Sequence, residues 1–471
     1  MLENIVDFIN IFFMYYIFIY AIIFFVSTIY SIVNLHESTL RKRYKNTINI
    51  YDESNYMPVS VLVPAYNEEK TILKCVESLL SLDYPEYEII VVNDGSKDKT
   101  KDVLIESFNL KEVKKPIRKQ LKCKEIVDVY EGFNKVKITL LNKENGGKAD
   151  ALNMGINASK YPLFLTLDAD SILQRDSLNN IIVPFMENEN TIAVGGNVKI
   201  SNNVLIEDGV VKKNSVPNRW LVIFQLIEYY RVFLTTRVWF NKFNGNLIIS
   251  GAFGLFKKKA VINVGGYDSG SIGEDMELVV KLHSFNKKNE NKYSIQYTPT
   301  AICWSQAPTK LKDLMGQRRR WHMGLMQSLL EHKYIFLNLK YGVIGTFSFL
   351  YYLIYEMLSC LIEVGGVIFI AISYLTGFIN LRFLITFMIV YLIYSSLISI
   401  SSIFLEEYFF DTKISFGGKV KLILFSFLEA FGYRQLCSIF RIIAIFTYKK
   451  KKAVWGEIER ESYLEKDRAS Q

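Results

Sequence analysis

The apolar residues of the chain gather in long runs near its two ends, with a mixed segment between them. Residues 11–33 contain no charged side chain, and two further apolar runs cover 343–374 and 383–405. An α-helix rises about 1.5 Å per residue, so each run is long enough to cross a hydrocarbon core of about 30 Å. The pattern predicts three membrane-spanning helices, one before and two after the mixed segment.

The last apolar segment, 419–447, has a different pattern. Glu429, Arg434 and Arg441 interrupt it. This spacing suits amphipathic helices that lie along the bilayer surface better than another crossing. We therefore expect a pair of interfacial helices here.

Two glutamates, Glu356 and Glu363, fall inside the predicted span 343–374. A carboxylate in the bilayer core is costly, and two explanations stay open. Either these side chains line a protein-filled or aqueous path, or part of the segment lies along the interface.

The N-terminal run predicts a retained anchor. Cleaved signal peptides begin with basic residues and have an apolar stretch of about 7–15 residues, whereas Glu3 and Asp7 precede a longer run here. The run is followed by a basic cluster of Arg41, Lys42, Arg43 and Lys45. Because basic flanks favour the cytoplasm, we expect the N-terminus outside the cell and the mixed segment inside it. Two C-terminal crossings then return the tail to the cytoplasm.

From about residue 56 to 310, short β-branched runs alternate with helical patterns. Strands are predicted to begin near residues 59, 88, 137 and 162, each followed by a polar loop. This alternation predicts an α/β domain with a mostly parallel sheet and helices on both faces, which binds ligands at the carboxyl ends of its strands. The lysine-rich stretch 101–136 is interpreted as a surface excursion.

Composition narrows the class of function. The five cysteines are scattered without a Cys-x-x-Cys pair, and the four histidines have no metal-ligand spacing, so neither a zinc site, a disulfide framework nor a His-based metal centre is indicated. The net charge of +9 lies largely beside apolar segments and in the tail. Membrane lipids with anionic head groups therefore explain it better than nucleic acid does.

Three clusters carry candidate chemistry. Asp168 and Asp170 follow an apolar strand and could hold a divalent cation, although a bare Asp-x-Asp also suits a solvated loop. Asp275 opens a helical segment and could act as a general base, although acidic residues also favour helix N-termini for electrostatic reasons. The segment 317–321 combines arginines with a tryptophan and could bind diphosphate and a sugar ring, or form a juxtamembrane belt.

Six motifs in order resemble those of the family 2 inverting glycosyltransferases, and in particular the membrane-integrated branch with cellulose, chitin, hyaluronan and poly-N-acetylglucosamine synthases. The motifs are ProAlaTyrAsnGlu (64–68), AsnAspGlySer (93–96), GlyGlyLysAlaAspAlaLeuAsn (146–153), AspAlaAsp (168–170), GlyGluAsp (273–275) and Gln-x-x-Arg-Trp (317–321). The resemblance covers roughly residues 56–325. It implies a GT-A-like α/β domain joined to transmembrane and interfacial helices.

The resemblance also implies site roles. Asp275 would be the catalytic base, and Mg²⁺ or Mn²⁺ would be held by Asp168 and Asp170. The donor-binding residues would be Pro64, Tyr66, Glu68, Asp94, Lys148 and Asp168. The residues facing the acceptor and the diphosphate would be Gly251, Glu274, Gln317, Arg320 and Trp321, although a plain tight turn explains Gly251 nearly as well.

These patterns together predict five parts of the chain. They are an N-terminal transmembrane anchor (1–40), a nucleotide-sugar-binding half (56–205), an acceptor and catalytic half with the Gln-x-x-Arg-Trp segment (206–340), C-terminal transmembrane and interfacial helices (341–448), and a basic cytoplasmic tail (449–471). The protein would be a multi-pass protein of the cell membrane with its catalytic domain in the cytoplasm.

The expected reaction is a metal-dependent transfer of a hexose or N-acetylhexosamine from a UDP-sugar, with inversion, to form a β-linkage. The expected product is a cell-surface or extracellular polysaccharide, and accessory membrane subunits could assist. Two alternatives stay open: transfer of one sugar to a lipid acceptor, and a non-catalytic membrane scaffold. The presence of all the core carboxylates argues against the scaffold.

Overall fold

The computed structural model describes most of the chain. The described ranges are 2–47, 56–378, 381–410 and 414–448. The tail 449–471, predicted to be cytoplasmic, lies outside them.

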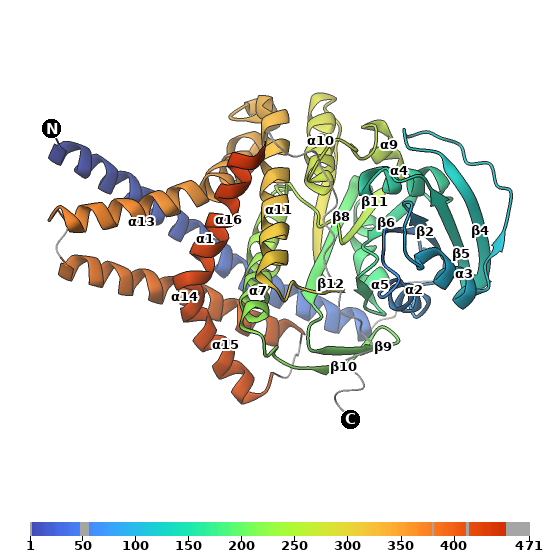
Figure 1. Cartoon of the computed structure of the whole chain (residues 1–471), viewed down its shortest axis with the longest axis horizontal. Coiled ribbons are helices and arrows are strands. Elements are labelled where there is room, and N and C mark those ends of the chain that lie inside the picture. The colour runs from blue at the N-terminus through green and yellow to red at the C-terminus, as the bar shows by residue number, and fades with distance from the viewer. Residues whose placement is uncertain (1, 48–55, 379–380, 411–413, 449–471) are drawn as a thin grey trace.

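Two regions of different character make up the molecule. A body built around a β-sheet lies at one end, and three long helices extend away from it: α1 (Leu2–Thr47), α13 (Ser359–Leu375) and α14 (Leu381–Phe410) (Figure 1). The beginning of α1, the end of α13 and the beginning of α14 lie farthest from the sheet (Figure 1). This arrangement puts the predicted membrane anchor and the C-terminal apolar helices on the same side of the body.

The centre of the sheet matches the sequence prediction. The central strands β5 (Val136–Lys143), β2 (Tyr87–Asn93), β1 (Val59–Ala65) and β6 (Leu163–Leu167) pair in that order and run parallel. Each begins close to the residue at which the β-branched pattern predicts it. Their polar carboxyl ends therefore meet at one edge, as expected for a parallel sheet.

The outer part of the sheet corrects the prediction of a mostly parallel arrangement. In the described residues the full order of ten strands is β3-β4-β5-β2-β1-β6-β11-β8-β12-β7. The added strands are β3 (Lys111–Glu112), β4 (Ile126–Asn134), β7 (Ile172–Leu173), β8 (Thr191–Ile200), β11 (Phe253–Lys257) and β12 (Ser294–Ser305). Strands β4 and β11 pair antiparallel with their central neighbours, so the sheet is mixed. Strand β4 comes from the lysine-rich stretch 101–136, where no strand was predicted.

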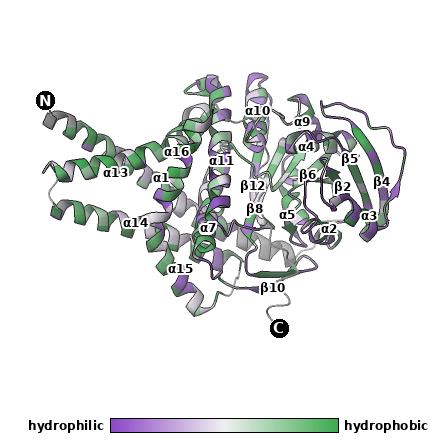
Figure 2. Ribbon diagram, in the orientation of Figure 1, coloured by the Kyte–Doolittle hydropathy of each residue, from purple (hydrophilic) through white to green (hydrophobic). Residues whose placement is uncertain are grey.

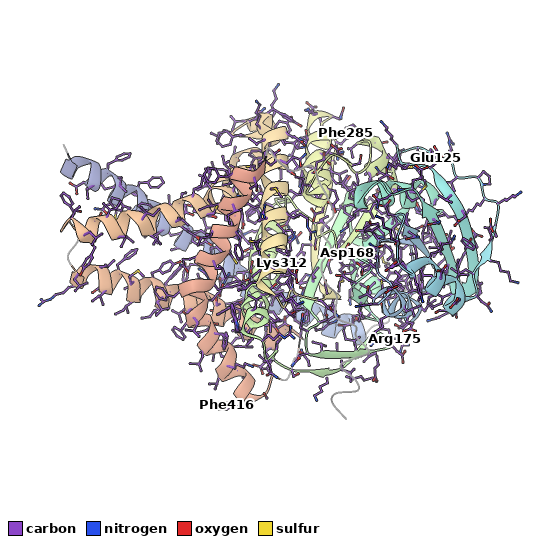
Figure 3. All side chains as sticks on the ribbon, in the orientation of Figure 1. Glu125, Asp168, Arg175, Phe285, Lys312 and Phe416 are labelled. Carbon is purple, nitrogen blue, oxygen red and sulfur yellow. The ribbon has the colours of Figure 1, made fainter. Side chains whose placement is uncertain are left out.

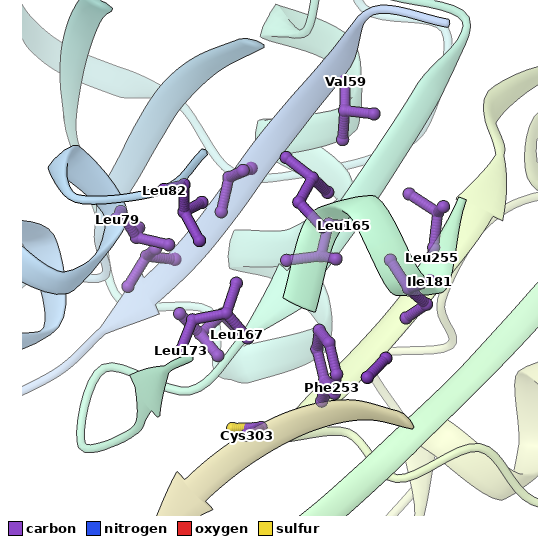
Figure 4. Packing of buried hydrophobic residues seen from close by; sticks show 14 of the residues in the cluster. Val59, Leu79, Leu82, Leu165, Leu167, Leu173, Ile181, Phe253, Leu255 and Cys303 are labelled. Carbon is purple, nitrogen blue, oxygen red and sulfur yellow. The ribbon is translucent and has the colours of Figure 1, made fainter. Parts of the chain in front are cut away.

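Helices cover both faces of the sheet because side chains alternate along each strand. Val61 and Val63 of β1 face one core with α2 (Ile72–Leu80), whereas Leu62 faces a second core with α4 (Lys148–Ala158). Figure 4 shows part of the first core, where Leu79, Leu82 and Ile181 pack against strand residues including Val59 and Leu165. The predicted helices on both faces are confirmed.

The remaining elements surround this body. A separate hairpin is formed by β9 (Val204–Glu207) and β10 (Val210–Asn214). The other helices of the body are α3 (Thr100–Phe108), α5 (Ser177–Ile181), α6 (Val183–Glu187), α7 (Trp220–Arg231), α8 (Arg237–Asn241), α9 (Lys258–Asn263), α10 (Glu274–Lys288) and α11 (Leu311–Glu331). Short π- and 3-10 turns lie at η2 (Val232–Thr236), η3 (Lys333–Ile335), η4 (Leu339–Tyr341), η5 (Ile344–Ser348), η6 (Tyr352–Met357) and η7 (Glu429–Tyr433).

Three helical segments of the described chain are long and apolar enough to cross a membrane: Val6–Glu37, Leu384–Phe410 and Phe416–Thr447. A fourth candidate is the pair Ile344–Met357 and Ser359–Leu375, which is bent by 46°. This pair occupies the predicted span 343–374 and includes α12 (Phe349–Tyr351). Figure 2 shows that the helices extending from the body are mainly hydrophobic.

The segment Phe416–Thr447 is long and apolar enough to cross a membrane, but it is not one continuous helix. It consists of α15 (Phe416–Leu428) and α16 (Arg434–Thr447), with non-helical dihedrals between them at Phe431 and Gly432 (φ 102°). In Figure 1, α16 runs across the direction of α13 and α14 and beside α11. The break at Phe431 and Gly432 is what an interfacial helix pair requires, whereas length and composition also allow a crossing, so the interfacial position stays a prediction.

Candidate active site

The first two strand-end loops of the candidate site bind each other through their side chains. Asn67 follows β1 in the left-handed conformation (φ 56°), which asparagine tolerates better than most residues. Its amide oxygen accepts a hydrogen bond from the Lys97 backbone at 2.8 Å, and its own N–H donates to Ser96 Oγ at 3.0 Å. These bonds set the positions of Tyr66 and of the motif around Asp94.

Two of the residues predicted to bind the sugar donor, Pro64 and Glu68, contact other residues of the protein. Pro64 is buried within β1, in register with Val92. Glu68 is 8% exposed, and its carboxylate accepts a hydrogen bond from Thr71 Oγ1 at 2.6 Å. The first motif therefore shapes the start of α2 as well as the edge of the sheet.

Asp94 is fully buried at the end of β2. Its carboxylate lies 2.6 Å from Lys143 Nζ and accepts hydrogen bonds from the backbone of Gly146 at 3.0 Å and Gly147 at 2.7 Å. Lys143 also pairs with Asp150 at 2.6 Å. Asp94 thus holds the glycine loop that leads into α4.

Lys148, in the first turn of α4, connects several of the motifs. Its Nζ lies 2.5 Å from Asp168 Oδ1, 3.6 Å from Glu274 Oε1 and 3.4 Å from the Gly251 carbonyl oxygen. Burial lowers the pKa of Lys148, but the Asp168 and Glu274 carboxylates outweigh that effect and hold the pKa above its ordinary value. Lys148 is therefore a cation between two carboxylates from distant parts of the chain.

Asp275 lies in the first turn of α10, next to this cation. Its Oδ2 accepts a hydrogen bond from the Gly251 N–H at 3.1 Å, and its Oδ1 accepts one from the Met276 N–H at 2.8 Å. Glu274 precedes it, and burial raises the pKa of Glu274 above its ordinary value. A Cβ atom on residue 251 would lie 3.0 Å from Lys148 Nζ and 3.5 Å from Asp275 Oδ2, so glycine leaves room for both.

The predicted metal ligands supply only part of a coordination shell. Asp168 is partly exposed at the end of β6, and Asp170 is 6% exposed with Ser171 Oγ 3.3 Å from its Oδ1. Within the described ranges, no group of three or more His, Cys, Asp or Glu side chains could hold a metal ion. Mg²⁺ is commonly bound by one or two carboxylates together with substrate phosphates. The residues therefore fit a divalent ion whose shell a nucleotide diphosphate completes.

Helix α11 carries the Gln-x-x-Arg-Trp segment. Trp321 is 45% exposed, and the Arg318 guanidinium lies over its ring, 4.7 Å from the centroid. Arg318 also pairs with Glu228 on α7 through two bonds of 2.7 and 2.8 Å. Gln317 Oε1 is buried without a hydrogen-bond partner among the described residues. Arg320 is half-buried on the same helix.

The structure brings several predicted residues into direct contact. The contacting set is Lys148, Asp168, Gly251, Glu274 and Asp275. Figure 3 labels Asp168 within the body, at a distance from the ends of the long apolar helices. The remaining predicted residues are Pro64, Tyr66, Glu68 and Asp94 in or after β1 and β2, Asp170 after β6, and Gln317, Arg320 and Trp321 on α11.

Sequence reasoning missed several residues that support this set. Lys143 is the last residue of β5, two positions after the predicted strand 137–141, so the same strand-end signal that selected Asp94 could have found it. Asp150 lies inside a recognised motif, and Arg318 lies inside the Gln-x-x-Arg-Trp segment, from which Arg320 was chosen instead. Their roles depend on partners far along the chain, which local patterns do not reveal.

The fold is that of an α/β protein. Carboxylates gather at the carboxyl ends of its parallel strands, and helices long and apolar enough to cross a membrane are attached to it. The family model described as glycosyl transferase family group 2 matches residues 163–401, and the model of glycosyl transferase family 2 matches residues 60–122. The first match covers half of the chain. The protein belongs to glycosyl transferase family group 2.

Curated relatives and a solved structure resemble parts of the chain. Poly-beta-1,6-N-acetyl-D-glucosamine synthases of Staphylococcus epidermidis and Staphylococcus aureus are 33% identical over 273 residues, 58% of this chain and 56% of theirs. The matched region thus spans little more than half the length of these relatives. A mannosyltransferase from Pyrobaculum calidifontis, in complex with GDP-Man and Mn²⁺, aligns over 92% of this chain and 99% of its own at 17% identity, with a TM-score of 0.48.

Proposed function

We propose that this protein is a membrane-bound glycosyltransferase that moves a hexose or N-acetylhexosamine from a UDP-sugar onto a growing polysaccharide, with inversion and a β-linkage. Membership of glycosyl transferase family group 2 supports the sugar transfer, and the 33% identity with poly-beta-1,6-N-acetyl-D-glucosamine synthases makes UDP-N-acetylglucosamine the first donor to test. The observation that carries the proposal is the position of Asp275. It lies beside the Lys148–Asp168 pair and accepts a hydrogen bond from Gly251.

In the proposed reaction, the acceptor hydroxyl oxygen attacks the anomeric carbon while the bond from that carbon to the diphosphate breaks. UDP leaves on the opposite face, and Asp275 takes the hydroxyl proton. One displacement inverts the anomeric centre, so no covalent enzyme intermediate is needed.

The donor would be held at the strand-end edge. Tyr66, Glu68 and the loop ordered by Asp94 would bind the nucleoside side, and Lys148 would face the diphosphate. A divalent ion held by Asp168 and Asp170 would neutralise charge on the departing diphosphate.

The acceptor would approach between Gly251 and α11. The buried Gln317 Oε1 would accept a hydrogen bond from a ligand, and the exposed face of Trp321 would stack on a sugar ring. Arg320, on the same helix, would face the diphosphate.

The catalytic domain would lie in the cytoplasm, where UDP-sugars are made, and the protein would be anchored in the cell membrane by α1 and the C-terminal helices. The basic residues that follow the first apolar run support this orientation. Accessory membrane subunits could be part of the assembly, and membrane lipids would surround the apolar helices.

The main test uses membranes that contain the full chain and labelled UDP-N-acetylglucosamine, UDP-glucose or a GDP-sugar. We expect one UDP-sugar to yield a high-mass product, and Asp275→Asn to lower the rate about 10²- to 10⁴-fold because the base is lost. Asp102→Asn is the matched control, since Asp102 also lies in the first turn of a helix, α3. A single labelled lipid band would indicate transfer of one sugar to a lipid instead, and full activity of Asp275→Asn would refute Asp275 as the base.

Metal dependence is tested separately. We expect EDTA to abolish transfer and added Mg²⁺ or Mn²⁺ to restore it, because two carboxylates and the diphosphate would bind the ion together. Asp170→Asn should raise the metal concentration needed for half-maximal rate, and titrations with each ion would measure this. An unchanged rate after complete removal of divalent ions would contradict the role of Asp168 and Asp170.

A further inference from the structure

Helices α10 and α11 meet at a contact between two glycines. Gly273 is the N-cap of α10, two residues before Asp275, and Gly324 lies within α11. A Cβ atom on residue 324 would lie 2.7 Å from Gly273 Cα and 2.9 Å from Gly273 N. A Cβ atom on residue 273 would lie 2.8 Å from Gly324 Cα. Both backbones therefore touch directly, and a side chain on either residue would force them apart.

One helical turn further along α11, Gln327 binds the loop that leads to Gly273. Its Oε1 accepts a hydrogen bond from the Ile272 N–H at 3.0 Å, and its Nε2 donates to the Gly270 carbonyl oxygen at 3.3 Å. The same amide nitrogen lies 2.9 Å from Glu331 Oε1, which orients the Gln327 side chain. The loop 270–273 is thus attached to α11 by both main-chain packing and a two-point side-chain contact.

This attachment connects two separate parts of the candidate site. Helix α11 carries Gln317, Arg320 and Trp321, and the loop ends at Glu274 and Asp275. Arg318 also fixes α11 to α7 through the bidentate bond with Glu228. The position of α11 relative to the sheet therefore determines the position of the loop 270–273 and of the first turn of α10, which follows that loop.

We propose that Gly324 and Gln327 are positioning residues that hold Asp275 at its working distance from the acceptor bound along α11. This inference rests on the proposed function, because it concerns the proposed base. Neither Gly324 nor Gln327 would touch substrate. Each acts through the loop 270–273, and a misplacement of about 1 Å at a reacting group can cost about 10²-fold in rate.

The chain offers a matched pair of substitutions for the test. Gly316 and Gly324 both lie in α11, so Gly→Ala gives each site the same gain in helix propensity. A Cβ atom on residue 316 has no neighbour within 4 Å, whereas one on residue 324 meets the Gly273 backbone. Gly316→Ala is therefore the control for Gly324→Ala.

The experiment compares wild type, Gly316→Ala, Gly324→Ala, Gln327→Ala and Gln327→Glu as full-length protein in detergent. We expect Gly324→Ala to lower kcat about 10- to 100-fold while the donor KM and the Kd for UDP stay within about twofold, since the misplaced group is the base and the donor edge is untouched. Gly316→Ala should match wild type. Gln327→Glu can still accept from Ile272, but it cannot donate to Gly270 and places a second carboxylate beside Glu331, so its kcat should also be lowered.

Hydrogen exchange of the 270–276 backbone provides a readout that does not need activity. We expect faster exchange there in Gly324→Ala and Gln327→Ala and no change in Gly316→Ala. Unchanged kcat and exchange in Gly324→Ala would overturn the proposal, as would a parallel loss of UDP affinity and thermal stability, which a merely structural role would produce. If wild type transfers no sugar, the proposed function fails, and the exchange data still decide whether α11 holds this loop.

Discussion

Single charged residues of the candidate site are held by partners from other motifs. Asp94 is fully buried, yet it pairs with Lys143 and accepts two backbone N–H groups. Lys148 likewise pairs with Asp168. Removal of one partner of such a buried pair commonly costs about 3–5 kcal/mol, because the other charge stays behind without compensation. Asp94→Asn should cost less than this, because Lys143 keeps Asp150 as a second partner at 2.6 Å.

His283 gives the body a pH-dependent stability. It is buried in α10, its Nε2 donates to the Asn246 carbonyl oxygen at 2.9 Å, and its Nδ1 accepts from Tyr293 Oη at 2.8 Å. Burial lowers its pKa to about 4. Since an unfolded histidine has a pKa of about 6.5, the native state binds fewer protons between these values. The stabilisation is complete above about pH 6.5 and is lost as the pH falls toward 4.

We expect a thermal-unfolding scan in detergent to show this window. Wild type should lose up to about 3 kcal/mol more than His283→Gln between pH 7 and pH 4, because the variant cannot take up that proton. The comparison uses the change with pH in each protein, so a uniform loss of stability in the variant does not affect it. If the stability of both proteins changed equally with pH, the lowered pKa of His283 would not be the cause of the pH dependence.

Among the elements, the pair α15–α16 has an exposed apolar stripe at helical spacing. Phe416, Val420, Leu424 and Leu428 are 82%, 41%, 59% and 55% exposed at intervals of four residues. The opposite face of α15 is buried, and α16 packs against α11 and α13. A helix pair with one apolar exposed side suits the plane of the bilayer surface.

Spin labels can decide whether the helices α15 and α16 lie along the bilayer surface or cross the bilayer. With labels at 420, 431 and 446, we expect similar shallow depths of about 5–10 Å, as for interfacial helices. A label at residue 389, on the exposed side of α14, is the control for a deep position. A depth that rises to the bilayer centre at 431 and falls again toward 446 would show that the segment Phe416–Thr447 crosses.

At the scale of the whole molecule, a buried ion pair joins the sheet to a candidate membrane helix. Lys199 of β8 lies 2.5 Å from Glu406 of α14, with side chains only 5% and 2% exposed. The Lys199 ammonium also lies 3.3 Å from the centroid of the Phe410 ring. Between α7 and the α15–α16 junction, Arg231 pairs with Glu429 at 2.8 Å. The body is therefore docked on the apolar helices through desolvated charges.

We expect Glu406→Gln to lower the free energy of unfolding by about 3–5 kcal/mol, because it leaves the Lys199 charge buried. The double variant Lys199→Met/Glu406→Leu should recover much of that loss, since no charge is then buried. Denaturant titration of detergent-solubilised protein, followed by transfer activity, would measure both. Equal losses in the single and double variants would show that packing rather than charge controls this junction.

The sequence predicted the features that depend on neighbours along the chain. Periodicity located the central strands, because a strand or helix repeats its burial every two or about 3.6 residues. The polar residues after β1, β2 and β6 were expected at one edge, because parallel strands bring their carboxyl ends together. The structure then placed Asp168 of one such loop in contact with Lys148.

Tertiary structure alone decided the rest. Strand β11 enters between β6 and β8 in antiparallel direction, which makes the sheet mixed, and no local pattern records that pairing. The Lys199–Glu406 pair joins residues 207 positions apart. The contact of Gly273 with Gly324 depends on how two helices cross. Local patterns determine which elements form and which residues are polar at their ends, whereas packing between distant elements determines which of those residues meet.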